Sequence, residues 1–293
     1  MKRTLTGCAA LIALLFGGCS SPRSAHSAKP DQPYENAMDT GKSVYEIGQS
    51  SQAEAQYRTA MDRALMRDDA VAIHEAGFNL ATVLLAQDQP RKTLQSLGTT
   101  EAALSLRNYA DTSDLAVIRA AALYRLHDTV FASQAVERAL KSPDSSIRER
   151  ALYLSGLIAA DLKQNSVLAS RVADLASFHD VAATVDRLEL TARLNLLQMQ
   201  PELAYGEALS VAQKRRDSLD YRGMRRALSL AADAAEAAGH LPQAQALRQQ
   251  ESISQQIAVK QAGDVPEVSS TPGKITVQVQ STSTDQSGTG AGY

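Results

Sequence analysis

The sequence has little of what cross-links a chain or carries out chemistry. Among 293 residues there are no tryptophans, four phenylalanines and two cysteines, so disulfide bonds cannot be the main source of stability. The apolar run over residues 8–16 is far shorter than the roughly 20 residues of a membrane-spanning helix. The net charge of −2 excludes the strongly basic character of nucleic-acid-binding proteins and of polybasic membrane-binding faces.

Catalytic and metal-binding signatures are missing from the sequence as well. It has no His-Glu-x-x-His and no Gly-x-Ser-x-Gly motif, and its five histidines lack the spacing of metal ligands. Residues 40–43 are similar to the end of a phosphate-binding loop, but Asn36 occupies the position of that loop's first glycine. We therefore expect no enzymatic activity, no catalytic residue, no metal site and no cofactor beyond a covalent lipid.

The first twenty residues carry the clearest signal in the chain. Lys2 and Arg3 precede the apolar run, which ends in two glycines and Cys19. This segment resembles a bacterial lipoprotein signal peptide, in which the cysteine after the cleavage site becomes the lipidated N-terminus. Removal of residues 1–18 would leave 28 basic and 32 acidic residues, with Cys19 as the only cysteine.

Two cysteines compete as the lipidated residue. The Leu-Thr-Gly before Cys8 matches the usual pattern better than the Phe-Gly-Gly before Cys19. No apolar segment precedes Cys8, however, whereas Cys19 has the whole apolar run ahead of it, so we predict lipidation of Cys19. By resemblance to lipoprotein sorting in enterobacteria, Ser20 indicates the outer membrane. The alternative is an ordinary cleaved signal that leaves a soluble periplasmic protein.

Composition divides the rest of the chain into three parts. Residues 19–34 contain small residues and prolines and predict a flexible tether. Residues 35–261 predict a helical repeat domain, and residues 262–293, rich in Ser, Thr and Gly, predict a disordered tail. Within the tail, Lys274–Gln280 alternates as a strand does and could instead pair with the sheet edge of another protein.

Residues 35–261 predict helices only. Apolar residues recur at steps of three and four, and the helix formers Ala, Leu, Gln, Arg and Glu dominate. Turn-like pairs recur about every 35 to 40 residues, which indicates a repeat of two helices of roughly 15 to 20 residues each. The turns are predicted at Gln49-Ser50, Asp88-Gln89, His127-Asp128, Gln164-Asn165, Met199-Gln200 and Gly239-His240. The first helices are predicted to start near Asp69, 111–114, Asp144, Asp180 and 217–218.

These hairpins resemble tetratricopeptide repeats. The best matches are residues 77–84, with their Asn-Leu-Ala, and residues 228–244, with Gly239 between the helices. The small residue that this family needs in its second helix has counterparts in Thr93, Ala132, Ala204 and Ala244. The family's tryptophan is missing, and the repeat exceeds its usual length of about 34 residues. The resemblance implies an all-α, right-handed solenoid of about six hairpins, with first helices along a concave face.

Two surfaces are candidates for binding. A basic cluster over residues 214–226 could bind a carboxylate, a phosphate or an anionic headgroup, or form a solvated helix end balanced by nearby aspartates. On the concave face, the resemblance implies Asn and basic side chains that hold a partner's backbone or carboxylate. The candidate partner-binding residues are Asn79, Arg119, Arg150, Arg187, Asn195, Arg222, Arg225 and Arg226.

The sequence thus predicts a periplasm-facing outer-membrane lipoprotein that acts as a protein–protein interaction scaffold. In architecture it is similar to the helical-repeat lipoproteins of outer-membrane and pilus assembly. We expect another envelope protein or peptide segment as partner, and the lipid on Cys19 would raise that partner's effective concentration. We expect neither nucleic acid nor a small-molecule substrate. The alternative is a peptidoglycan- or anionic-lipid-binding module that uses the basic cluster.

Overall fold

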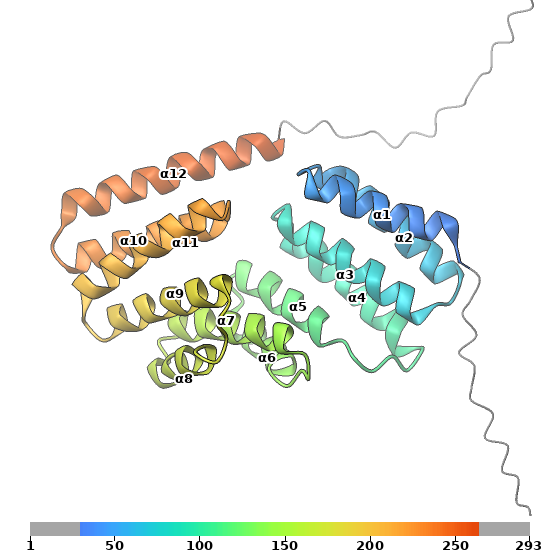
Figure 1. Ribbon diagram of the computed structural model, residues 1–293, viewed down its shortest axis with the longest axis horizontal. Helices are drawn as coiled ribbons and strands as arrows, with labels where there is room; N and C mark the ends of the chain where they lie inside the picture. The colour runs from blue at the N-terminus through green and yellow to red at the C-terminus, as the bar shows by residue number, and fades with distance from the viewer. Residues whose placement is uncertain (1–29, 264–293) are drawn as a thin grey trace, which may run out of the picture. The chain divides into compact units, whose positions relative to one another are not determined.

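The chain folds into α-helices that follow one another as hairpins (Figure 1). The computed structural model describes residues 30–263, so the predicted signal peptide, Cys19 and residues 274–280 lie outside the described part. Twelve helices make up that part: α1 (Gln32–Glu46), α2 (Ser50–Met66), α3 (Ala70–Ala86), α4 (Pro90–Ser105), α5 (Ser113–Arg125), α6 (Thr129–Ala139), α7 (Ser145–Asp161), α8 (Asn165–Leu175), α9 (Val181–Leu197), α10 (Pro201–Asp217), α11 (Tyr221–Ala237) and α12 (Leu241–Gly263).

All six predicted turns are confirmed, because each one joins the two helices of a hairpin. Asp69, Asp144 and Asp180 also begin first helices as predicted. The side chain of each accepts a hydrogen bond from a backbone N–H in the first helical turn, which satisfies a donor that has no partner within the helix. The predicted all-α fold of about six hairpins is therefore correct for the described residues.

The helix start predicted at residues 217–218 is wrong. Helix α10 continues to Asp217, and the chain turns at Leu219, whose φ is +61°. Asp220 then caps α11, since its carboxylate accepts a hydrogen bond from the Gly223 N–H at 2.8 Å. Helix lengths also vary more than predicted: α6 and α8 have 11 residues each, and α12 has 23. Helix α1 begins at Gln32, ahead of the predicted boundary at 35.

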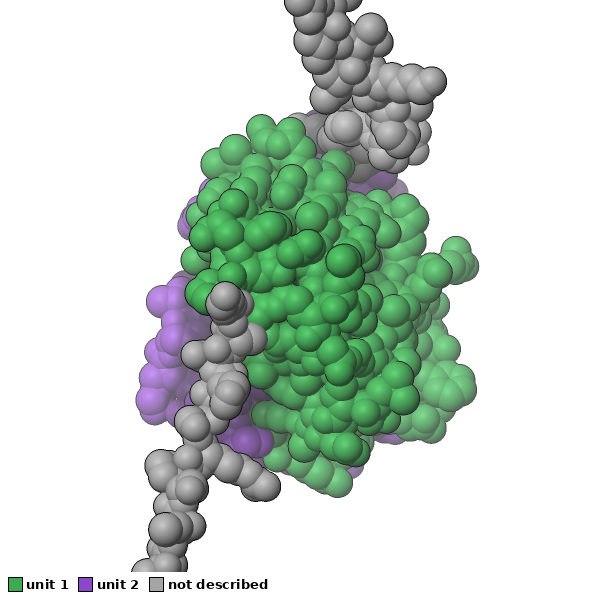
Figure 2. Space-filling model, turned by 90° about the vertical axis from the view of Figure 1, so that its right-hand side faces the viewer, with its two compact units in different colours: residues 1–142 green, residues 143–293 purple. Residues whose placement is uncertain are grey.

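The described chain forms two compact units, which Figure 2 colours separately. Unit 1 covers residues up to 142 and contains α1–α6, and unit 2 covers the residues from 143 and contains α7–α12. Within unit 1, α3 packs against α2, α4 and α5; within unit 2, α9 packs against α7, α8, α10 and α11. In each unit the hairpins therefore stack on their neighbours in chain order, as in helical-repeat proteins.

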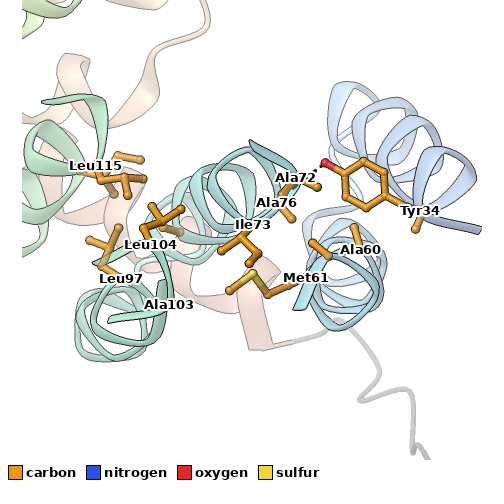
Figure 3. Packing of buried hydrophobic residues seen from close by; sticks show 14 residues of the cluster. Tyr34, Ala60, Met61, Ala72, Ile73, Ala76, Leu97, Ala103, Leu104 and Leu115 are labelled. Atoms are coloured by element: carbon orange, nitrogen blue, oxygen red, sulfur yellow. Dashed lines mark hydrogen bonds between the residues drawn. The ribbon is translucent and has the colours of Figure 1, made fainter. Parts of the chain in front are cut away.

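Small residues allow the paired helices to approach closely. Thr93, Ala132, Ala204 and Ala244 are all buried, as predicted for the second helices of their four hairpins. In unit 1, larger apolar residues fill the space between hairpins, and Figure 3 shows Ile73, Leu97 and Leu104 among them. Each of these three side chains is almost completely removed from water, a burial that stabilises the fold by about 1.5–3 kcal/mol per side chain.

Candidate protein-binding surface

The predicted basic cluster lies on α10 and α11 of unit 2, and two of its arginines are engaged inside the protein. Arg215 comes from the last turn of α10, and Arg226 comes from the first half of α11, which packs against α10. Both guanidinium groups contact Tyr153 on α7 and Glu189 on α9. The two cations therefore join four helices of the unit.

Glu189 is the centre of a buried polar network, and its side chain is 0% exposed. Tyr153 Oη donates a hydrogen bond to Glu189 Oε2 at 2.6 Å, and Arg226 Nε donates to Glu189 Oε1 at 2.6 Å. Arg215 Nη2 donates to Glu189 Oε2 at 3.3 Å and also pairs with Asp186. We call Tyr153, Asp186, Glu189, Arg215 and Arg226 the Glu189 network.

The surroundings of the Glu189 network set its protonation states. Burial alone would raise the pKa of Glu189, but Arg226 and Arg193 outweigh burial and lower this pKa to about 2. Burial raises the pKa of Asp186 to about 6, against the attraction of Arg215. Burial also raises the pKa of the Tyr153 hydroxyl well above its usual value. At neutral pH the network therefore holds two carboxylates, two guanidinium groups and a neutral phenol.

This balance gives the Glu189 network a structural role. A buried charge is tolerated when an opposite charge and hydrogen bonds compensate it. Arg215 Nη1 also lies 3.3 Å from Oδ2 of Asp220, the residue that caps α11. Of the aspartates within the cluster, Asp220 thus pairs with Arg215, whereas the other aspartate partner of Arg215, Asp186, comes from α9.

A groove of about 760 Å³ lies between the first half of α11 and the second half of α12. Its lining is mainly apolar, and Tyr221, Ile253 and Ile257 each keep about half of their surface exposed. We call it the α11–α12 groove, lined by Arg216, Tyr221, Met224, Arg225, Leu228, Gln250, Ile253, Ser254, Ile257 and Ala258. Among the described lining residues two are arginines and none carries a carboxylate.

The structure spreads the predicted partner-binding residues over both units. In unit 1, the Asn79 side chain donates to the Glu75 carbonyl at 2.8 Å. Arg119 of α5 forms an ion pair of 2.6 Å with Glu101 of α4. Both side chains therefore have partners within the protein, and neither lines the α11–α12 groove.

The remaining predicted residues lie in unit 2. Arg150 on α7 and Arg187 on α9 are exposed, whereas the Asn195 side chain donates to Glu207 on α10 at 2.8 Å. Arg222 is half-buried on α11. Arg225 lines the α11–α12 groove and donates to Ser254 on α12 at 3.4 Å. The structure thus brings only Arg225 of the eight to the groove, and Arg226 to the Glu189 network.

Comparisons with known proteins add a likeness in fold. No protein-family model and no curated protein matches the sequence. Among solved structures, the chain is similar to a tetratricopeptide repeat protein from Parabacteroides merdae, with 17% sequence identity and a TM-score of 0.48. The match covers 79% of this chain and 93% of that chain. The helix order and helix–helix contacts of the chain itself show consecutive α-helical hairpins, independently of this likeness.

Sequence reasoning missed the groove and the centre of the Glu189 network. A signal for Glu189 was present, because an acidic residue lies between the apolar positions Val185 and Ala192 of the stripe along α9. An acid on an apolar face indicates a buried charge that needs a cationic partner. The groove has a weaker signal, in Ile253 and Ile257, four residues apart within a polar helix. Among residues 30–263, no group of three or more potential metal ligands occurs.

Proposed function

We propose that this chain is a protein-interaction scaffold of the bacterial envelope, held on the periplasmic side of the outer membrane by a lipid on Cys19. The observation that carries the interaction role is the α11–α12 groove, where Tyr221, Ile253 and Ile257 leave apolar surface in contact with water. A contiguous apolar surface around a concave groove favours cover by a partner.

The lipid would confine the groove to the vicinity of the membrane and so raise the effective concentration of an envelope partner. The support for this part is the signal-like segment that ends at Cys19. In residues 30–263, no helix combines the length and the apolar character that a membrane crossing requires.

Replacement of Cys19 tests the anchor. We expect Cys19→Ala to lose palmitate labelling and to leave the outer-membrane fraction, because the acylated thiol is gone. Cys8→Ala is the matched control and should retain both label and location. Wild-type protein without palmitate label would remove the anchor from the proposal.

Photocrosslinking in intact cells tests the interaction role. A photoreactive residue in place of Ile257 should capture a specific envelope protein, since Ile257 lines the groove. The same residue in place of Val181, which is 82% exposed on α9 and lies outside the groove, is the control. A second probe at Arg187 tests the predicted first-helix surface. Capture at Arg187 without capture at Ile257 would move the binding surface to the first helices.

The alternative, binding of peptidoglycan or anionic lipid by residues 214–226, draws less support from the geometry. Arg215 and Arg226 are neutralised by internal carboxylates, so the cluster offers less positive charge than its sequence suggests. Sedimentation with cell-wall sacculi or anionic liposomes tests it directly. A loss of sedimentation in an Arg222→Gln, Arg225→Gln double variant would favour this alternative.

A further inference from the structure

The α11–α12 groove has the residue spacing of a helix-binding surface. On α11, Tyr221, Met224 and Leu228 follow one another at steps of three and four residues, so they form a stripe along one side of the helix. On α12, Ile253 and Ile257 are four residues apart and form a second stripe. Two apolar stripes on the helices of one hairpin match the apolar face of a third helix, which repeats at the same steps.

Among the described residues, no helix packs on the outer side of α12 in unit 2. Helices α8 and α10 each pack against the first helix of the following hairpin, α9 and α11 respectively. Helix α12 packs against α11, and no described helix follows it. Ile253 and Ile257 accordingly remain 49% and 53% exposed, whereas Val211 and Ala212 of α10 are buried.

Charge identifies the chemistry of the occupant. Arg216 stands at the edge of the groove, and its Nη1 donates to Gln213 at 3.0 Å. Arg216 and Lys214 are both exposed, and the ion pairs formed between described residues of this cluster involve Arg215 and Arg226, not Arg216. Because none of the described lining residues is a carboxylate, the groove is complementary to an acidic side chain, which arginine binds through two parallel hydrogen bonds.

We propose that the α11–α12 groove binds an amphipathic helix of a partner protein. The apolar face of that helix packs on Tyr221, Ile253 and Ile257, and a Glu or Asp at its edge pairs with Arg216. This inference rests on the proposed scaffold function. It adds the kind of partner segment, an amphipathic helix, and the residue that orients it, Arg216.

Synthetic peptides test the proposal on the purified full-length chain. Two labelled helical peptides carry leucines at steps of three and four, and one has glutamates where the other has lysines at the edge of the apolar face. We expect fluorescence anisotropy to show the glutamate peptide binding about three- to tenfold more tightly, because the swap replaces attraction to Arg216 by repulsion. Arg216→Glu should reverse this preference.

Matched variants locate the binding. Ile253→Asp and Ile257→Asp should abolish binding of both peptides, because a carboxylate would be buried against the peptide's leucines. Leu203→Asp changes a comparably exposed leucine on α10 outside the groove and should bind as the wild type does. Circular dichroism of each variant verifies that the helices remain folded.

Several results would overturn the proposal. Equal affinity for the two peptides, or no binding of either, would do so directly. A change in sedimentation mass in the Ile257→Asp variant would assign the groove to a second copy, and loss of anionic-vesicle binding in Arg216→Glu would assign it to a lipid surface. The anchor test with Cys19→Ala is independent, so failure of the envelope role and failure of helix binding are distinguishable.

Discussion

The two units use the same hairpin but hold it together differently. In unit 1 the spaces between hairpins are filled by residues such as Ile73, Leu97 and Leu115. In unit 2 the cluster around α10 and α11 is apolar as well, but α7, α9, α10 and α11 also enclose the buried ionic Glu189 network. The hairpin repeat therefore tolerates either an apolar or an ionic interior, provided that polar groups find partners.

The two units also differ in the residue types that occupy the left-handed positions of their turns. In unit 1 the left-handed backbone positions are occupied by Gly48, Asp68, Asp88, Asn108 and His127, and most of these types adopt positive φ with little strain. In unit 2 they are occupied by Lys163, Met199, Leu219 and Gly239. Three of these four residues are types that rarely adopt this conformation. Unit 2 therefore combines a costly interior with strained turns.

Removal of the Glu189 carboxylate should destabilise unit 2 more than any other change considered. Glu189→Ala leaves Arg215 and Arg226 without their shared buried partner, and we expect a loss of about 3–5 kcal/mol in the free energy of unfolding. Urea denaturation measures this loss, and hydrogen exchange by mass spectrometry should place it in unit 2 peptides.

The matched change in unit 1 is Glu101→Ala, which breaks the partly exposed pair with Arg119. We expect a loss of about 0–1 kcal/mol there, because water screens the pair. Equal losses for the two variants would mean that the Glu189 network is no more important than a surface ion pair.

The stabilities of the two units should depend on pH in different ranges, because Asp186 titrates in unit 2 and His74 in unit 1. We expect this effect to be smaller than that of Glu189→Ala. The folded pKa of Asp186, about 6, lies above its usual 3.8, so its contribution to stability is present below pH 3.8 and is lost as pH rises through about 6. In unit 1, His74 Nε2 donates a hydrogen bond of 2.9 Å to Asp114 Oδ1, and this bond raises the pKa of His74 above its usual 6.5. The contribution of His74 is therefore present below pH 6.5 and is lost only above it.

Hydrogen-exchange protection factors measured across this range check the order of the two losses. Asp186→Asn should remove the pH dependence of the unit 2 protection factors below pH 6.5 and leave those of unit 1 unchanged. His74→Gln should remove the pH dependence of the unit 1 protection factors above pH 6.5 and leave those of unit 2 unchanged. Coincident losses in both units, unaltered by either variant, would contradict these assignments.

The sequence predicted what is local and periodic. Turn positions, aspartate caps and the small residues at Thr93 and Ala244 all depend on neighbours within one hairpin. The start of α11 was misplaced because Asp217 and Asp220 are both good caps, and only the backbone at Leu219 decides between them.

Contacts between hairpins were beyond the sequence pattern. Tyr153 and Arg226 are 73 residues apart in the sequence, yet Arg226 Nη2 donates a hydrogen bond of 2.6 Å to Tyr153 Oη. No sequence periodicity predicts this contact. The two stripes of the α11–α12 groove each look like an ordinary helix face, and only the packing of unit 2 shows that they lie side by side. Cys19 and its lipid stay a prediction, since they lie outside the described residues.

The turns offer the smallest and finest test of the comparison. Met199 has a φ of +61° and is 85% exposed, so its side chain contributes little packing. Met199→Gly should stabilise unit 2 by about 0.5–1 kcal/mol, because relief of left-handed strain exceeds the added flexibility of the unfolded chain. Asn108→Gly in unit 1 should change stability little, since asparagine adopts positive φ readily. If urea denaturation gave the larger gain for Asn108→Gly, turn strain would not distinguish the units, and their difference would lie in their interiors alone.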